Sequence, residues 1–544
     1  MSLAKMWIKR CTTNHEKCRI LPPASPRIEQ QWYPTRLLEV GPLTEESPWC
    51  RLILPQDTPI QGPYMTLSHC WGLAHCMSLT TDNYAQLLKG IPLEDLPQLY
   101  KDALYVAAQI GIRYMWIDSL CIIQKGDDLA DWRQEAGLMN QVYSKSFCTV
   151  SAACARDSTE SMFNNLNPDL IHPQIVQLRV AGKDVPHLVS EPKFWNMEVN
   201  RALINTRAWV FQERILSSRV LYFGKDQIFW ECQQQDAAEI YPDGTSAYVV
   251  TGTPRFRGAW PDYLSHRSAD EDEELRKHVQ WVNLVTEYSS NNITFAKDKL
   301  IALSAIAKTH MAWNGDQYLA GLWRKWLEWE LSWSVTRPLD DFNAMAVCRC
   351  NPLPKKAEYR APSWSWASAD RPVNPGLESS QSHDLLIEVE DVHLDYVTAD
   401  ITGLVSGGWV DVWGVLKKLE LIPHALKGVL FWELVVNGIS IEVPTFAETQ
   451  MEIRFDDTER NFQEMENPSE LYCLPAAVER DGGIYGEQTD ALVLEPHDAA
   501  RGIFRRIGVA YSEVCPEKIL VRNANEGTLP CVRYENGRHL IRII

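Results

Sequence analysis

The 544-residue chain is too long for a single hydrophobic core, so we expect it to divide into roughly two to four domains. Its content of 45% hydrophobic and 23% charged residues is ordinary for a folded protein. The formal net charge of −18 argues against general binding to DNA or to an anionic membrane, because their phosphate groups would be repelled at long range.

The first residues, MSLAKMWIKRCTTNHEKC, lack the long apolar run of a secretory signal. No uninterrupted apolar run elsewhere approaches the ~20 residues of a membrane-spanning helix. The 14 cysteines are scattered, and several lie in apolar runs where a buried reduced thiol is the common state. We therefore expect a cytoplasmic protein with neither a nucleic-acid nor a membrane partner.

Strand-like and helix-like segments alternate in the first part of the chain. Short apolar runs indicate buried strands, and apolar residues at helical spacing indicate amphipathic helices. The expected order is strand 64–72, helix 94–111, strand 113–118, helix 127–146 and strand 147–154. Such alternation predicts a parallel sheet with right-handed crossovers. Apolar rather than alternating strands fit a sheet that is covered on both faces.

The rest of the chain departs from this rhythm. Clusters of Asn, Pro and Asp indicate an insertion at 156–205, after which the helix and strand of 206–223 resume the α/β pattern. We predict an N-terminal extension over 1–60, an α/β domain over 61–233, a mostly helical region over 234–345 and an antiparallel β-rich domain over 346–544.

Four segments together resemble the fungal heterokaryon-incompatibility (HET) domain, and they occur in the order of that family. They are YMTLSHCWG, RYMWIDSLCIIQ with the DW and VYS that follow, FCTVSAA, and RAWVFQERILSSRVLYF with the WEC beyond it. They cover roughly residues 60–232. The later YRAPSWSWAS is similar to a segment often found downstream in long fungal proteins of this type.

The HET domain is similar in turn to TIR domains, which implies a flavodoxin-like, TIR-like parallel sheet. Several TIR domains hydrolyse NAD at the nicotinamide–ribose bond, using a glutamate that follows a tryptophan by four positions on a helix. Trp209 and Glu213 match that spacing, which places both on one helical face. The resemblance therefore implies that Glu213 is catalytic.

Further candidate residues follow from the expected sheet, because ligands of open parallel sheets bind beyond the carboxyl ends of the strands. Substrate-binding candidates are Ser68, His69, Trp71, Asp118, Arg207 and Trp209. Trp71 could stack on a base, and Arg207 could meet a phosphate or pair with Glu213.

Each candidate also has a purely structural interpretation. Glu213 could be an ordinary helix-surface or Arg-paired glutamate, and Trp209 could belong to the core. His69 could be a structural histidine with satisfied hydrogen bonds, and Trp71 could cap the edge of the sheet. Asp118, at the end of an apolar strand, fits either interpretation.

Other chemistries have weaker support. The spacing Cys11-x3-His15-x2-Cys18 is one that a zinc site could use, but no fourth ligand is evident. Cys70 could pair with His69 as nucleophile and base, yet neighbours on a strand point to opposite faces. No Walker-type loop and no GxGxxG motif occurs. We predict no metal and no cofactor, with NAD as a candidate substrate.

Three functions stay open. The first is a HET protein of fungal non-self recognition and programmed cell death that hydrolyses NAD. The second is a signalling module that self-associates through the HET domain without catalysis. The third is a HET fold recruited to secondary-metabolite biosynthesis, with the β-rich domain framing the pocket. Partners implied are further copies of the chain and a small nucleotide.

Overall fold

The computed structural model describes a defined set of residues, to which all structural statements refer. They are residues 1–18, 32–41, 49–72, 77–164, 174–180, 182–189, 194–245, 273–336, 359–376, 383–426, 429–436, 438–441, 451–456, 470–479, 488–512 and 528–544. The chain divides into two compact units, Met1–Glu271 and Asp272–Ile544.

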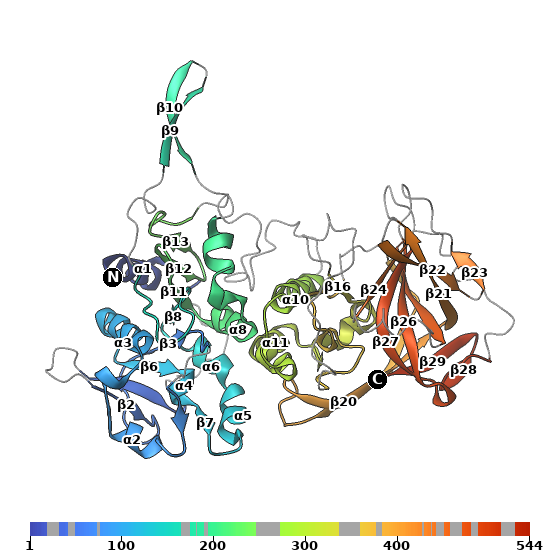
Figure 1. The fold of residues 1–544 in the computed structure, drawn as a ribbon, viewed down its shortest axis with the longest axis horizontal. Coiled ribbons are helices and arrows are strands. Elements are labelled where there is room, and N and C mark those ends of the chain that lie inside the picture. Colours follow the sequence, from blue (N-terminus) through green and yellow to red (C-terminus); the bar gives the residue numbers. More distant parts are fainter. Residues whose placement is uncertain are drawn as a thin grey trace. The chain divides into compact units, whose positions relative to one another are not determined.

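A nine-stranded mixed sheet forms the centre of the first unit, with strand order β13-β12-β11-β8-β3-β6-β1-β2-β5 (Figure 1). Four central strands run parallel to one another, and they are β11 (Arg219–Phe223), β8 (Thr149–Ser151), β3 (Tyr64–Ser68) and β6 (Tyr114–Ile117). Antiparallel strands extend both edges, namely β12 (Ile228–Cys232), β13 (Asp236–Ala238), β1 (Leu37–Val40), β2 (Trp49–Ile53) and β5 (Ile91–Pro92). The prediction of a parallel sheet is therefore correct only for the centre, and the unit as a whole is mixed α/β.

The connections of this sheet are mostly helical. The helices are α1 (Ser2–Asn14), α2 (Tyr84–Lys89), α3 (Gln98–Ile110), α4 (Asp118–Cys121), α5 (Ala130–Ala136), α6 (Met139–Ser144) and α8 (Ala208–Leu216), and the short strands β4 (Leu79–Thr80) and β7 (Ile123–Lys125) pair beside them. Gly111 ends α3 in a left-handed conformation with φ of 90°, and its N–H bonds to the carbonyl of Ala107. The prediction of one continuous helix over 127–146 is wrong, because the structure has two separate helices, α5 and α6, on either side of Gly137.

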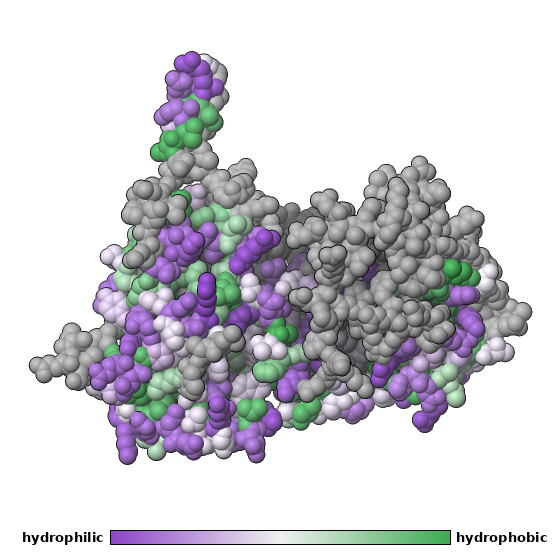
Figure 2. Space-filling view, viewed as in Figure 1, coloured by the Kyte–Doolittle hydropathy of each residue, from purple (hydrophilic) through white to green (hydrophobic). Residues whose placement is uncertain are grey.

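Segments predicted as an extension and as an insertion both contribute ordered elements. Within 1–60 the structure places α1, β1 and β2, and β1 pairs directly with the central strand β6. Within 156–205 it places the hairpin of β9 (Gln174–Val180) and β10 (Lys183–Val189), then the short turns η2 (Asn196–Asn200) and η3 (Leu203–Thr206). Large apolar side chains are exposed on this hairpin (Figure 2), and they are Ile175, Val176, Leu178 and Val185.

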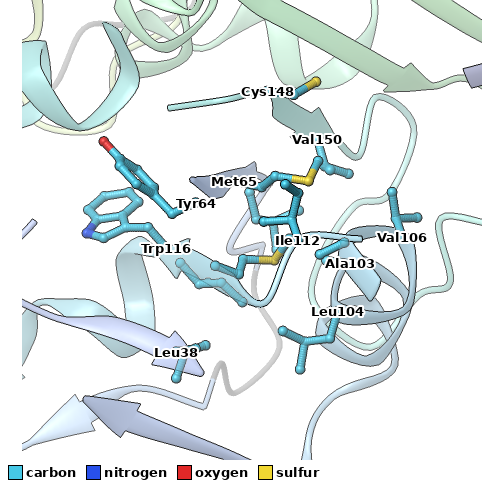
Figure 3. Close-up of a cluster of buried hydrophobic side chains, with 14 of the residues drawn as sticks. Leu38, Tyr64, Met65, Ala103, Leu104, Val106, Ile112, Trp116, Cys148 and Val150 are labelled. Carbon is cyan, nitrogen blue, oxygen red and sulfur yellow. The ribbon is translucent and has the colours of Figure 1, made fainter. Parts of the chain in front are cut away.

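The core of the first unit lies against the parallel strands (Figure 3). Met65 of β3 and Val150 of β8 are fully buried there, together with Trp116 of β6. Ala103, Leu104 and Val106 of α3 pack onto the same cluster. Close packing on the strands fixes where each strand ends, and those ends carry the candidate site.

The second unit combines helices with a large antiparallel sheet. Its helices are α10 (Glu273–Ser289), α11 (Ile301–Asn314) and α12 (Leu327–Glu330). The sheet contains β18 (His383–Leu385), β19 (Glu388–Tyr396), β20 (Val405–Gly414), β21 (Lys417–Leu426), β22 (Val429–Val436), β23 (Ile439–Ile441), β24 (Met451–Phe455), β25 (Leu471–Glu479), β26 (Gln488–Asp498), β27 (Ile503–Ser512), β28 (Arg533–Glu535) and β29 (Arg538–Ile543). Two short pairs accompany it, β14 (Tyr318–Leu319) with β15 (Leu322–Trp323) and β16 (Ser334–Val335) with β17 (Val373–Asn374). Among the described strands of the large sheet, β27 with β29 is the one parallel pair.

Tryptophans link the helices of the second unit to its sheet. In the segment SWSW, Trp364 and Trp366 are fully buried, and the Trp366 indole donates to the carbonyl of Gly321 at 2.8 Å. The Trp333 indole donates to the carbonyl of Trp364 at 2.9 Å. Arg506 of β27 stacks on the Trp333 ring, with 3.7 Å between the guanidinium carbon and the ring centroid. The downstream motif is therefore a core element of this unit.

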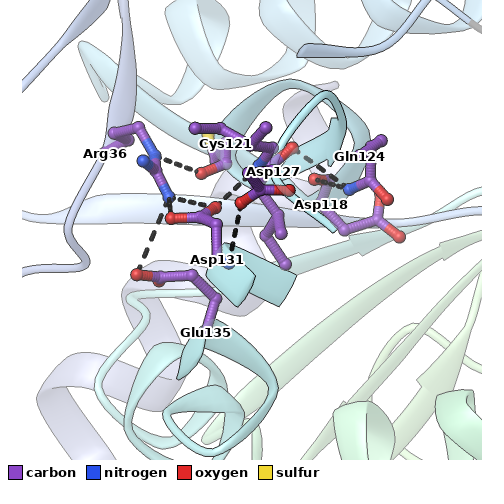
Figure 4. A network of polar contacts seen from close by, with 9 residues as sticks. Arg36, Asp118, Cys121, Gln124, Asp127, Asp131 and Glu135 are labelled. Atoms are coloured by element: carbon purple, nitrogen blue, oxygen red, sulfur yellow. Dashed lines mark hydrogen bonds and ion pairs between the residues drawn. The ribbon is translucent and has the colours of Figure 1, made fainter. Parts of the chain in front are cut away.

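A buried arginine near the start of β1 joins the N-terminal segment to the α4–α5 region of the first unit (Figure 4). Arg36 donates to the carbonyl of Cys121 at 2.7 Å and to both carboxylate oxygens of Asp131, at 2.7 and 2.6 Å. Glu135 lies 3.7 Å from the same guanidinium. The side chains of Arg36 and Glu135 are 5% and 2% exposed, so this network is largely shielded from solvent.

Replacing Arg36 should therefore be costly. Arg36→Met leaves the buried carboxylate of Glu135 and the partly buried carboxylate of Asp131 without their cation, and we expect the free energy of unfolding of the first unit to fall by about 3 kcal/mol. Hydrogen-exchange mass spectrometry of peptides from β1 and β6 measures this change. Arg113→Met is the matched control, since Arg113 is 60% exposed and its partner Glu39 keeps Arg51; its cost should stay below about 1 kcal/mol. Equal effects of the two substitutions would contradict the interpretation.

Candidate functional site

Polar side chains gather where β3 and β6 end. β3 finishes at Ser68, and Asp118 follows β6 directly as the first residue of α4. The two strands are parallel neighbours in which Leu67 pairs with Ile117, so Ser68 and Asp118 leave the sheet at the same edge. This is the edge at which open parallel sheets bind ligands.

Glu213 reaches this edge from α8. The Ser68 hydroxyl donates to Oε2 of Glu213 at 2.5 Å, and Tyr143 acts on the pKa of the same carboxyl group, which it lowers. Glu213 is 7% exposed, because α8 buries this face against the sheet. The side chain therefore lies inside the protein, in contact with the end of β3, and is not a surface glutamate.

A chain of hydroxyl groups fixes the backbone of α8 at this position. Ser217 donates to the carbonyl of Glu213 at 2.6 Å, and its hydroxyl lies 2.5 Å from that of Thr149. The Thr149 hydroxyl lies 2.7 Å from that of Thr66. These buried bonds connect α8 to β8 and β3, so the helix cannot shift without leaving polar groups unpaired.

Burial dominates the electrostatics of Glu213. It raises the pKa of this carboxyl from 4.5 to about 7, despite the Ser68 hydrogen bond, which lowers it. The negative charge of Asp118 raises the pKa further, and the positive charge of Arg207 opposes this. Glu213 consequently changes its charge near neutral pH, which is typical of groups that carry chemistry.

His69, Trp71 and Asp118 form a second layer of the cluster. The Trp71 indole donates to Oδ2 of Asp118 at 2.8 Å. Nδ1 of His69 lies 3.6 Å from Oδ1 of Asp118, and Nε2 lies 3.2 Å from the Tyr100 hydroxyl. Burial lowers the pKa of His69, so this ring is neutral at pH 7. Asp118 is the more accessible carboxyl, with its side chain 27% exposed.

Arg207 caps the cluster from the start of α8. Its Nη1 donates to the backbone carbonyl of His69 at 2.8 Å. Gly72, which follows Trp71, has φ of +64°, and an added Cβ would come within 2.6 Å of the Arg156 carbonyl. The position after Trp71 therefore accepts only glycine without a shift of the neighbouring backbone.

Trp209 does not join this cluster in the structure. Its ring packs edge-to-face on Trp132, with 5.8 Å between the ring centroids, and it adjoins the hydrophobic core. The structure thus brings together Ser68, His69, Trp71, Asp118, Arg207 and Glu213, and it places Trp209 in a packing role.

Two tyrosines of the cluster were absent from the sequence prediction. Tyr143 contacts Glu213, and Tyr100 bridges His69 to Ser119, whose hydroxyl lies 2.7 Å from that of Tyr100. Both lie on helical segments, 98–110 and 139–144, where an aromatic residue is expected to be core. The sequence feature that could have pointed to Tyr143 is the VYS motif, which is part of the resemblance to the HET family.

Comparison with known families gives a match over the region of the polar cluster. Residues 64–213 match the family model described as heterokaryon incompatibility protein (HET). This segment is a HET domain. The match begins at the first residue of β3 and ends at Glu213, so it contains each residue of the polar cluster. No curated protein and no solved structure matched the chain. Among the described residues, no helix is both long and apolar enough to cross a membrane.

The raised pKa of Glu213 predicts a dependence of stability on pH. The folded HET domain holds the Glu213 proton more tightly than the unfolded chain does, so raising the pH through the window from 4.5 to 7 favours unfolding. Between pH 5 and pH 8 the loss should be about 2 kcal/mol. Glu213→Gln removes this loss, because the amide does not ionise.

The measurement is hydrogen-exchange mass spectrometry of peptides from β3 and β8, comparing wild type with Glu213→Gln at each pH. Intrinsic exchange rates then cancel. The stability of Glu213→Gln relative to wild type should increase as the pH rises. A difference between the two proteins that stays constant from pH 5 to pH 8 would show that Glu213 does not titrate in this window.

Proposed function

We propose that this chain acts in non-self recognition of the heterokaryon-incompatibility type, and that its HET domain, with a TIR-like site, cleaves NAD at the nicotinamide–ribose bond. The observation that carries the proposal is Glu213 itself. It is a buried carboxyl with a pKa of about 7, bonded to Ser68 at the ligand-binding edge of the parallel strands. Its four-residue spacing from Trp209 is that of the TIR catalytic helix.

The chemistry requires little more than this cluster contains. Loss of nicotinamide passes through a state in which positive charge develops on the ribose, and a carboxylate held against the sugar stabilises that charge. The leaving group is a cationic pyridinium that departs neutral, so no strong general acid is needed. A water molecule bonds to the ribose carbon that nicotinamide leaves and releases one proton to solvent. Ionised Glu213 supplies the negative charge, and Ser68 orients its carboxylate.

The neighbouring residues have complementary roles in this proposal. Trp71 offers a ring on which nicotinamide or adenine stacks, and Arg207 offers a cation for the phosphates. Asp118 holds the Trp71 indole and faces the accessible side of the cluster. His69, neutral and buried, positions the turn between Ser68 and Trp71 and takes no proton from the substrate.

Substrate access couples this activity to assembly. Glu213 is 7% exposed, so NAD reaches it only when the groups above it move. TIR relatives often complete their site between protomers, and we propose that self-association of the HET domain opens the cluster in the same way. A protein of this kind is inactive when dilute and active when assembled.

A second candidate function has an observation of its own. The β9–β10 hairpin exposes Ile175, Val176, Leu178 and Val185, of which Ile175 is 67% exposed. Exposed apolar side chains on a paired strand favour contact with another chain. The HET domain would then act as a non-catalytic, self-associating signalling module.

Nicotinamide release from NAD separates the two functions. Purified full-length protein is incubated with NAD, alone and with a crowding agent, and products are followed by chromatography. The first function predicts release that rises with protein concentration and falls at least ~100-fold in Glu213→Gln. It also predicts that the rate rises with pH through about 7, since the ionised form of Glu213 is the active one.

Glu198→Gln is the matched control. Glu198 is a half-buried glutamate of the same unit whose pKa is also raised by burial, and it lies outside the polar cluster. Its rate should stay within about twofold of wild type. Absence of nicotinamide release from protein that light scattering shows to be assembled would refute catalysis and favour the signalling module.

A further inference from the structure

Four potential metal ligands meet at the N-terminal side of the first unit. Cys11 lies in the last turn of α1, His15 follows the end of that helix, and Cys18 comes three residues later. Cys232 is the last residue of β12. Their ligand atoms all lie within 4.8 Å of one another. The fourth group that the spacing Cys11-x3-His15-x2-Cys18 lacks in the sequence is thus supplied by a strand more than two hundred residues away.

The distances are close to those of a tetrahedral zinc site. With Zn–S near ~2.3 Å and Zn–N near ~2.0 Å, neighbouring sulfur and nitrogen ligands lie about 3.5 Å apart and two sulfurs about 3.8 Å apart. Nδ1 of His15 lies 3.4 Å from the Cys232 sulfur and 3.8 Å from the Cys18 sulfur. A contraction of about 1 Å or less brings the widest pair to the ideal separation.

We propose that Cys11, His15, Cys18 and Cys232 bind one structural zinc ion. Three thiolates and one imidazole form a closed tetrahedral set, with no position left for a substrate or water. Binding displaces the protons of those thiols that are not yet ionised, so the three sulfurs enter as thiolates.

The surroundings favour this charge. Zinc with three thiolates carries one net negative charge, and Nε of Arg219 donates to the Cys11 sulfur at 3.2 Å. The backbone N–H of Gln235 donates to the Cys232 sulfur at 3.3 Å. Such donors to ligand sulfurs are the usual second layer of a zinc–thiolate centre.

The ion would hold α1 on the edge of the sheet. α1 already lies against β12 (Figure 1). Trp7 of α1 stacks on Trp230 of β12, with 6.4 Å between the ring centroids, and its indole donates to the carbonyl of Pro242 at 2.8 Å. β12 pairs with β11, and β11 pairs with the parallel strand β8. Zinc therefore closes a link between the start of the chain and the strands that follow the Glu213 helix.

Metal analysis of full-length protein tests the proposal without any substitution. Protein purified under reducing conditions and without chelator should contain about one equivalent of zinc by mass spectrometry of the metal. Replacement by Co²⁺ should give the intense visible bands of tetrahedral cobalt and a thiolate-to-cobalt band in the near ultraviolet. Folded protein that holds no zinc as purified and takes up none on reconstitution would overturn the proposal, as would a disulfide between any two of the three cysteines.

Variants then assign the ligands. Cys232→Ser should lower the zinc content at least ~10-fold, while Cys154→Ser, at a half-buried cysteine outside the four ligands, should leave it unchanged. His15→Cys should keep the metal and shift the cobalt spectrum to that of four thiolates, which a merely structural histidine would not do. An unaltered cobalt spectrum in His15→Cys, or full zinc in folded Cys232→Ser, would refute this ligand set. If Cys232→Ser does not fold, the wild-type and His15→Cys measurements decide.

Discussion

The hydrogen bond from Ser68 to Glu213 is the constraint on which the geometry of the HET domain depends. A buried carboxyl group destabilises the fold unless polar groups form hydrogen bonds with it. The burial of Glu213 therefore requires three elements to lie close together. β3 delivers Ser68, α6 delivers Tyr143, and α8 delivers Glu213 itself. The hydroxyls of Thr66, Thr149 and Ser217 hold the same elements together on the backbone side.

The two carboxyl groups of the cluster sit in unequal environments. Glu213 is enclosed, and burial outweighs both its hydrogen bonds and the charge of Arg207. Asp118 is more open and is held by an indole and a backbone N–H. Unequal environments for two neighbouring acids are a recurring way of giving them different tasks at one pH. Here the enclosed acid changes its charge near neutral pH, while the open one is partly exposed to solvent.

Much of this arrangement follows from local sequence pattern. The segments that form β3, β6 and β8 are short and lie in mostly apolar stretches of the sequence, and their order along the chain brings Ser68 and Asp118 to one edge. The edge strands of the sheet were harder to predict from the sequence, because LLEV of β1 is only four residues long and resembles any short apolar run. Parallel or antiparallel pairing there depends on partners far away in sequence. The break between α5 and α6 was hidden because a single glycine inside a helical pattern is often tolerated.

The side chains show the same division between local and distant information. The sequence predicts that Trp209 and Glu213 lie on one helical face. It does not predict their different environments, in which Trp209 packs on Trp132 and Glu213 accepts a hydrogen bond from Ser68. The sequence alone could not identify Tyr143 as a site residue, because its role depends on which side chain of α8 lies next to it in the fold. Cys232 shows the limit most clearly, since proximity to His15 arises only when the sheet is complete.

The segment that matches the family, residues 64–213, is shorter than the compact unit that contains it, Met1–Glu271. Residues 64–213 contain every residue of the polar cluster, yet they omit β1, which pairs with β6, and β11, which pairs with β8. A fragment cut at these limits would present two bare strand edges to solvent and would lack Ser217, which anchors the helix of Glu213. The segment that matches the family is thus shorter than the sheet to which it belongs, and a recombinant HET domain intended for biochemistry has to include α1 and extend past β13.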